Sequence, residues 1–177
     1  MAITLVLGGA RSGKSAYAQR QAEQAAAKTG RPPLMIATAE AFDDEMRDRI
    51  DRHRDERGDS WRTLEVPLDL TGAIRGLTVE DVVVVDCLTL WLSNLMLGNH
   101  DLAAATDDLI EAFAGCEATV WAVSNEVGWS LVPENALGRR FRDEAGRLNQ
   151  RIAAVADAAR LIIAGMCMDL KSADRLR

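Results

Sequence analysis

The stretch from Gly8 to Ser15, GGARSGKS, constrains this chain more than any other, because it matches the phosphate-binding pattern GxxxxGK[ST] in full. An apolar run rich in β-branched residues precedes it at 3–7, and a segment of strong helix formers follows at 16–28, ahead of Gly30. The pattern therefore lies between the carboxyl end of a predicted strand and the amino end of a predicted helix, where such a loop binds phosphate. We expect the chain to bind a nucleoside phosphate.

The expected contacts of this loop follow from its residue types. Backbone N–H groups and the helix amino end would hold phosphate oxygens, Lys14 would reach the outer phosphates as a catalytic residue, and Ser15 would offer its hydroxyl to Mg²⁺. The predicted nucleotide-binding residues are Gly8, Gly9, Ala10, Arg11, Ser12, Gly13, Lys14 and Ser15. The alternative is a glycine turn beside a surface lysine, but the full pattern and both flanks argue against it.

Apolar strands alternate with helical segments through the rest of the chain. Strands are expected at 34–39, 61–66, 82–86, 118–126 and 160–165, helices at 42–57, 88–97, 102–114 and 135–159, a helix or turn at 68–77, and a frayed tail at 171–177. Each strand is too apolar for a sheet with one solvent-exposed face. The pattern therefore predicts an α/β fold with a mostly parallel sheet covered by helices on both faces.

Length and composition narrow the classes of protein. A chain of 177 residues fits a single domain, 1–177, and its net charge of −6 argues against nucleic-acid binding. There is no apolar run long enough to span a membrane and no room for a signal peptide before the first strand, so we expect a cytoplasmic protein. The odd number of cysteines, without CxxC spacing, predicts buried thiols at Cys87, Cys116 and Cys167.

Asp86 follows Val82–Val85, the strongest strand signal in the chain, and this is the form of a Walker B strand. In a P-loop fold the aspartate would reach Mg²⁺ or its water shell. An aspartate after an apolar run is otherwise a helix cap or a turn residue. Glu126, at the end of another apolar strand, is a weaker candidate, with a structural role as well supported as a functional one.

His53 lies on the apolar face of the predicted helix 42–57, among several arginines. Neutral imidazole can attack phosphorus, and neighbouring guanidinium groups would hold a polyphosphate. Residue types alone nevertheless favour a packed or salt-bridged histidine, because a charge-rich helix is usually a solvated face. The spacing does not decide between these interpretations.

The order and separation of longer blocks carry a resemblance to a known family. These blocks are GGARSGKS, ATAEAFDDEMRDRIDRHRDERGDSWRTLE, VVVVDCLTLWLSN and SNEVGWSLVPENALGRRFRDEAGRLNQRIA. Together they resemble the bifunctional adenosylcobinamide kinase / adenosylcobinamide-phosphate guanylyltransferase family over about residues 3–166. The resemblance implies phosphorylation of adenosylcobinamide by a nucleoside triphosphate, ATP or GTP, and then transfer of GMP from GTP through a covalent intermediate on His53.

The resemblance also implies further site residues and partners. Thr38, Ala39 and Glu40 would lie near the nucleotide at a strand end, Arg54, Asp55, Glu56 and Arg57 would continue the contact after the nucleophile, and Glu65 and Asp86 would complete the pocket. It implies a RecA-like P-loop fold, Mg²⁺, a corrinoid substrate and a homo-oligomer, specifically a trimer. It names no corrinoid-binding residue. Two other hypotheses fit the phosphate loop: a small-molecule kinase in which His53 is structural, and a regulatory nucleotide-binding switch.

Overall fold

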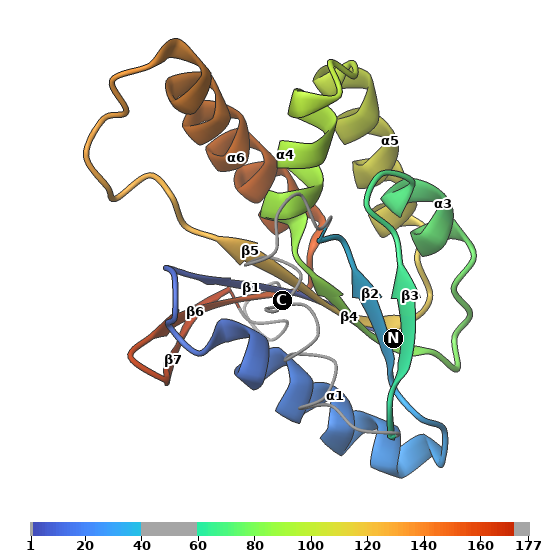
Figure 1. Ribbon diagram of the computed structural model, residues 1–177. Helices are drawn as coiled ribbons and strands as arrows, with labels where there is room; N and C mark the ends of the chain where they lie inside the picture. Colours follow the sequence, from blue (N-terminus) through green and yellow to red (C-terminus); the bar gives the residue numbers. More distant parts are fainter. Residues whose placement is uncertain (1, 40–59, 172–177) are drawn as a thin grey trace.

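A seven-stranded sheet forms the centre of the computed structural model, which describes residues 2–39 and 60–171 (Figure 1). Its strands are β1 (Ala2–Gly8), β2 (Leu34–Ala37), β3 (Arg62–Glu65), β4 (Val82–Asp86), β5 (Thr119–Asn125), β6 (Ala158–Ile163) and β7 (Met166–Lys171). Their order is β3-β2-β4-β5-β1-β6-β7, and every neighbouring pair is parallel except β6 and β7. The predicted α/β class with a mostly parallel sheet is confirmed.

Helices cover both faces of this sheet, as predicted. They are α1 (Lys14–Thr29), α3 (Leu70–Arg75), α4 (Leu88–Leu97), α5 (Leu102–Ala114) and α6 (Ala136–Val155). In Figure 1, α1 lies below the sheet, whereas α3, α4, α5 and α6 lie above it. None of these helices, in the part of the chain that the structure describes, combines the length and the hydropathy that crossing a bilayer requires.

The two faces of β1 show how the sequence divides the core. Leu5 and Leu7 belong to the apolar cluster on the face covered by α3–α6, whereas Val6 belongs to the cluster between the sheet and α1. Successive strand residues point to opposite faces. On α1 the buried residues Ala18, Ala22 and Ala26 recur every four positions and form a stripe of small side chains along one face. This stripe lets α1 pack closely on the sheet, which fixes the phosphate loop at its amino end.

The carboxyl-terminal part of the sheet differs from the sequence prediction. The helix expected at 135–159 ends at Val155, and β6 already begins at Ala158. Alanines favour a helix here, but Asp157 exchanges hydrogen bonds with Ile3: its carboxylate accepts from the Ile3 N–H at 2.7 Å, and its own N–H donates to the Ile3 carbonyl at 2.9 Å. Pairing with β1 therefore overrides local propensity.

Strand β7 was not predicted, and Lys171, assigned to a frayed tail, is its last residue. The Lys171 ammonium donates to the carbonyls of Ala153 and Ala154 at 3.0 and 3.2 Å, at the end of α6. This contact caps the orphan carbonyls of that helix. The predicted helix 42–57 lies outside the described residues. Of the cysteines, Cys87 alone is buried, Cys116 is half-buried and Cys167 is exposed, so the prediction of buried thiols was wrong for Cys167.

Candidate phosphate-binding site

The carboxyl ends of the parallel strands bring the predicted loop and acidic residues to one edge of the sheet. Gly8, where the loop begins, pairs with Asn125 at the end of β5. Ala37 at the end of β2 pairs with Asp86 on one side and with Glu65 on the other. In open α/β sheets this edge is where ligands bind.

The phosphate loop, residues 8–15, leaves the amino end of α1 open. Gly13 is the cap residue of α1 with φ 94°, and no side chain caps the helix there. Arg11 also has a positive φ of 55°. A left-handed backbone at these positions turns the loop back toward the helix axis, and glycine adopts it without a Cβ penalty. The first N–H groups of α1 therefore remain available to an anion.

Lys14 folds back over its own loop. Its ammonium donates to the Gly9 carbonyl at 3.2 Å, and the side chain is buried. A buried ammonium is stabilised by polar partners, and phosphate oxygens would be far better partners than a carbonyl because they carry charge. This geometry suits the predicted role of Lys14 at the outer phosphates.

The loop is supported closely from the side of β6. A Cβ on Gly8 would lie 2.6 Å from the Ile162 carbonyl oxygen and would also collide with Ser12 Oγ. The Ser12 carbonyl accepts from the N–H of Gly165, in the turn between β6 and β7, at 2.9 Å. Buried Ser12 Oγ has no hydrogen-bond partner among the described residues. An orphaned hydroxyl inside the loop is a polar group that a bound oxyanion would satisfy.

Asp86 ends β4 at the same edge of the sheet as the phosphate loop, with the end of β5 between them. The pKa of the Cys87 thiol is raised to about 11, first by burial and then by the Asp86 carboxylate, while the Lys14 ammonium partly lowers it. Lys14 and Asp86 therefore both act on one buried sulfur. Cys87 remains a neutral thiol at physiological pH, with no role as a nucleophile.

Thr38 clamps the backbone that carries Asp86. Its hydroxyl donates to the Cys87 carbonyl at 2.7 Å and accepts from the Cys87 N–H at 2.8 Å, while its own N–H donates to the Asp86 carbonyl at 3.1 Å. The Asn94 amide then donates to the Thr38 carbonyl at 2.8 Å and to the Pro67 carbonyl at 3.0 Å. Thr38 is fully buried, so it positions the Asp86 segment, and its hydroxyl has no capacity left to donate to a nucleotide.

A second buried network fixes the end of β5. Thr89 accepts from the Asn125 N–H at 2.7 Å and contacts Ser124, whose hydroxyl donates to Asn149 of α6 at 2.6 Å. The Asn149 amide donates to the Asn125 carbonyl at 3.2 Å. Sequence reasoning missed Thr89, Asn94 and Asn149; an amide inside the apolar stripe of a predicted helix was the available signal for the last two.

The other predicted site residues lie in different settings. Ala39 is half-buried after β2, and Glu65 is exposed at the end of β3. The carboxylate of Glu126 accepts from the Gly128 N–H at 2.8 Å, which gives Glu126 a role in a turn. Six predicted residues lie outside the described residues: Glu40, His53, Arg54, Asp55, Glu56 and Arg57.

The donors at this edge fit a magnesium ion by their chemistry. Ser15 offers a hydroxyl and Asp86 a carboxylate, both hard oxygen ligands, and Mg²⁺ keeps several waters when it binds with substrate phosphates. Residues 2–39 and 60–171 contain no group of three or more His, Cys, Asp or Glu side chains that could hold a metal. Two protein donors leave the other positions around such an ion to waters and substrate phosphates.

The chain is similar to known proteins over most of its length. A family model described as cobinamide kinase / cobinamide phosphate guanyltransferase matches residues 4–170. Bifunctional adenosylcobalamin biosynthesis protein CobP of Pseudomonas aeruginosa is 44% identical, with 94% of this chain and 96% of that protein covered. The corresponding CobU protein of Salmonella typhimurium is 42% identical, with 94% and 98% covered.

A solved structure of an ATPase domain is similar in fold. Its TM-score is 0.55 at 13% sequence identity, with 98% of this chain and 78% of that domain covered. At this identity the likeness concerns the fold alone, and it agrees with the predicted P-loop class.

Proposed function

The chain belongs to the cobinamide kinase / cobinamide phosphate guanyltransferase family, and from this premise we propose how its phosphate-binding site serves both activities. It is a bifunctional enzyme of adenosylcobalamin biosynthesis, which phosphorylates cobinamide and then transfers a guanylyl group to cobinamide phosphate. The observation that carries the proposal is that the open phosphate loop, with buried Lys14, and Asp86 lie at the same edge of the sheet.

In the kinase step, the loop holds the triphosphate through its backbone N–H groups and Lys14 neutralises charge on the outer phosphates. The cobinamide hydroxyl oxygen forms a bond to the γ-phosphorus, the bond from that phosphorus to the bridging β,γ-oxygen breaks, and the hydroxyl proton leaves to solvent. Ser15 and Asp86 would hold Mg²⁺, which supplies charge neutralisation between the phosphates when bound. ATP or GTP serves as the donor.

In the transfer step, His53 is the proposed carrier of GMP. Its imidazole nitrogen forms a bond to the α-phosphorus of GTP as the bond to pyrophosphate breaks; the phosphate oxygen of cobinamide phosphate then displaces the histidine. Glu40, Arg54, Asp55, Glu56, Arg57 and Glu65 are proposed nucleotide contacts. This assignment rests on the sequence motif, because His53 lies outside the described residues.

A covalent adduct tests the proposed nucleophile. Incubation with Mg²⁺ and GTP labelled on the α-phosphate, followed by denaturation and intact mass measurement, should reveal a GMP-sized adduct that is acid-labile and alkali-stable. His53→Ala should lack the adduct, while His100→Ala, which changes a loop histidine, should retain it. Absence of an adduct from the wild type with GTP bound would leave a kinase without a covalent transfer step.

We further propose that the enzyme acts in the cytoplasm as a homo-oligomer, a trimer. This proposal rests on the resemblance of the sequence to the family. Analytical ultracentrifugation of the full chain measures the oligomeric mass directly.

A further inference from the structure

The segment between β5 and α6 exposes large apolar side chains that the core does not use. Trp129 is 72% exposed, Leu131 93% and Val132 62%. We call residues 127–137 the apolar loop; its last residue, Leu137, is also exposed. Contiguous apolar side chains left in water commonly mark a site of interaction.

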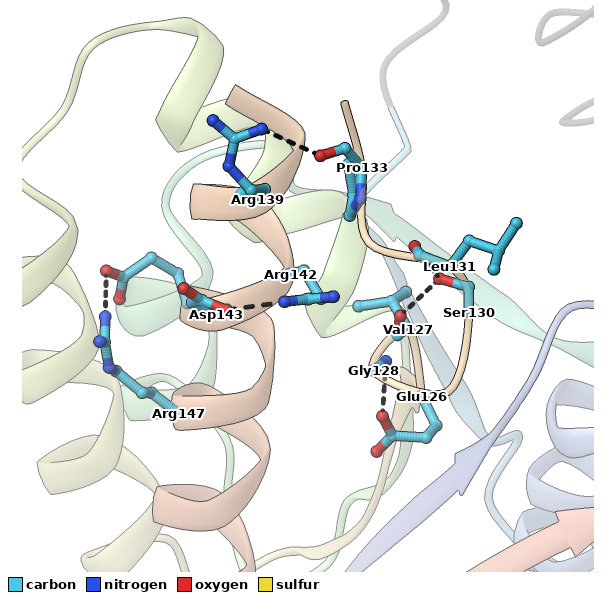
Figure 2. Close-up of polar contacts among 11 residues, drawn as sticks. Glu126, Val127, Gly128, Ser130, Leu131, Pro133, Arg139, Arg142, Asp143 and Arg147 are labelled. Atoms are coloured by element: carbon cyan, nitrogen blue, oxygen red, sulfur yellow. Dashed lines mark hydrogen bonds and ion pairs between the residues drawn. The ribbon is translucent and has the colours of Figure 1, made fainter. Parts of the chain in front are cut away.

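The apolar loop has a defined internal structure, which Figure 2 shows. Ser130 Oγ donates to the Val127 carbonyl at 3.0 Å, and Arg139 of α6 donates to the Pro133 carbonyl at 3.0 Å. Val127 packs against the core, and a Cβ on Gly138 would lie 2.8 Å from Pro133 Cβ. These contacts hold the backbone and leave the apolar side chains outward, so a ligand would meet them with little ordering cost.

The apolar loop begins next to the phosphate loop. The N–H of Glu126 donates to the Gly8 carbonyl at 3.1 Å, one residue before the apolar loop and at the first residue of the phosphate loop. In Figure 1 the two loops leave the sheet at the same edge, from adjacent strands β1 and β5. The apolar loop therefore begins beside the phosphate loop, and in Figure 1 it runs from there toward the start of α6.

A cation accompanies the apolar side chains. In Figure 2 the side chain of Arg142 extends from α6 on the side of the apolar loop, whereas Arg147 extends on the other side and pairs with Glu144 at 2.7 Å. The only ion pair of Arg142 among the described residues joins its Nε to Asp143 at 3.7 Å, which leaves the terminal guanidinium nitrogens to other partners. An arginine fork of this kind suits a phosphate.

We propose that the apolar loop binds the corrin ring of cobinamide and that Arg142 faces the phosphate of cobinamide phosphate. This inference rests on the proposed function, which supplies a substrate with a large ring, apolar methyl groups and amide side chains. Such a ligand matches a surface of apolar side chains with few polar groups. Position beside the phosphate loop and the charge of Arg142 favour this occupant over a second copy of the chain.

Substrate binding to the full-length enzyme separates ring recognition from nucleotide recognition. Equilibrium dialysis would measure cobinamide and GTP independently for Val132→Ser and Trp129→Ser. The matched control is Val79→Ser, because Val79 is 61% exposed, almost as much as Val132, but lies before β4. We expect the loop variants to bind cobinamide about 10-fold more weakly or worse, with GTP affinity unchanged.

The role of the Arg142 charge is tested with Arg142→Gln, and Arg147→Gln is the matched control. The first should weaken cobinamide phosphate by roughly 10-fold while changing cobinamide little, since a charge-assisted contact to phosphate is lost. The second should change neither ligand, because Arg147 bonds to Glu144 on its own helix.

The outcomes separate this inference from the function beneath it. Undiminished cobinamide affinity in the loop variants would overturn the inference alone, and so would a smaller oligomeric mass in those variants, which would assign the apolar loop to contacts between copies. A wild-type enzyme that binds GTP but no cobinamide would overturn the proposed function itself.

Discussion

The phosphate loop and the apolar loop leave neighbouring strands at one edge of the sheet, yet they are built in opposite ways. The phosphate loop depends on its backbone. Gly13 and Arg11 have left-handed conformations, no side chain caps the start of α1, and the buried Lys14 bonds to the Gly9 carbonyl of the same loop. The apolar loop uses side-chain hydrogen bonds to hold its backbone and exposes its apolar side chains. Phosphate is recognised by backbone geometry, which needs fixed residues at fixed spacing, whereas a large apolar ring needs only exposed apolar area.

Lys14→Ala should give the largest effect on the backbone-built region. Removing a charge-assisted contact to the outer phosphates is expected to weaken GTP binding by roughly 100-fold, while cobinamide binding changes little. Isothermal titration with each ligand measures both. Lys28→Ala, in the last turn of the same helix, is the matched control. Wild-type GTP affinity in Lys14→Ala would remove the phosphate loop from the nucleotide site.

Thr38→Val should give an intermediate effect, on the support of the nucleotide site. It leaves the buried N–H and carbonyl of Cys87 without their partner, at a cost of about 2 kcal/mol in the free energy of unfolding, and it loosens Asp86. The Mg²⁺ concentration needed for half-maximal GTP binding should rise.

Thr38→Ser is the control, because it keeps the hydroxyl and loses one methyl group, at a cost of about 1 kcal/mol. Urea unfolding and a magnesium titration of GTP binding check both variants. An equal magnesium requirement in Thr38→Val and Thr38→Ser would make Thr38 a packing residue only.

Leu131→Ser should give the smallest effect on stability. The Leu131 side chain is almost fully exposed, so the free energy of unfolding should change by less than about 0.5 kcal/mol. Leu109→Ala, at a fully buried position of α5, should cost about 3 kcal/mol in the same urea titration. A large loss from Leu131→Ser would mean that the apolar loop supports the fold, against the contrast between the two loops.

The same contrast explains what the sequence could predict. The phosphate loop, the helix that ends ahead of Gly30 and the strand that ends at Asp86 depend on local residue types, and the structure confirms them as elements. Thr38 was assigned to the nucleotide site because of its place in a motif, and the structure adds that its hydroxyl bonds to Cys87, 49 residues away. Pairings over such distances leave no local pattern.

The carboxyl-terminal strands are a part of the fold that local sequence could not predict. Residues 153–159 are rich in alanine and are good helix formers, and only the pairing of Asp157 with Ile3 reveals where the helix ends. Strand β7 is exposed and has no alternation to identify it. The roles of the site residues, including His53, remain predictions.

The place of β1 between β5 and β6 sets the order in which the site matures on the ribosome. The phosphate loop is synthesised before the segments that support it, because its strand pairs with residues 119–125 and 158–162 and its turn accepts a hydrogen bond from Gly165. Because synthesis proceeds from the amino end, the phosphate loop is made well before the strands and the turn that support it. A nascent chain arrested before residue 158 would carry the whole phosphate motif without β6 beside it and without the support of Gly165.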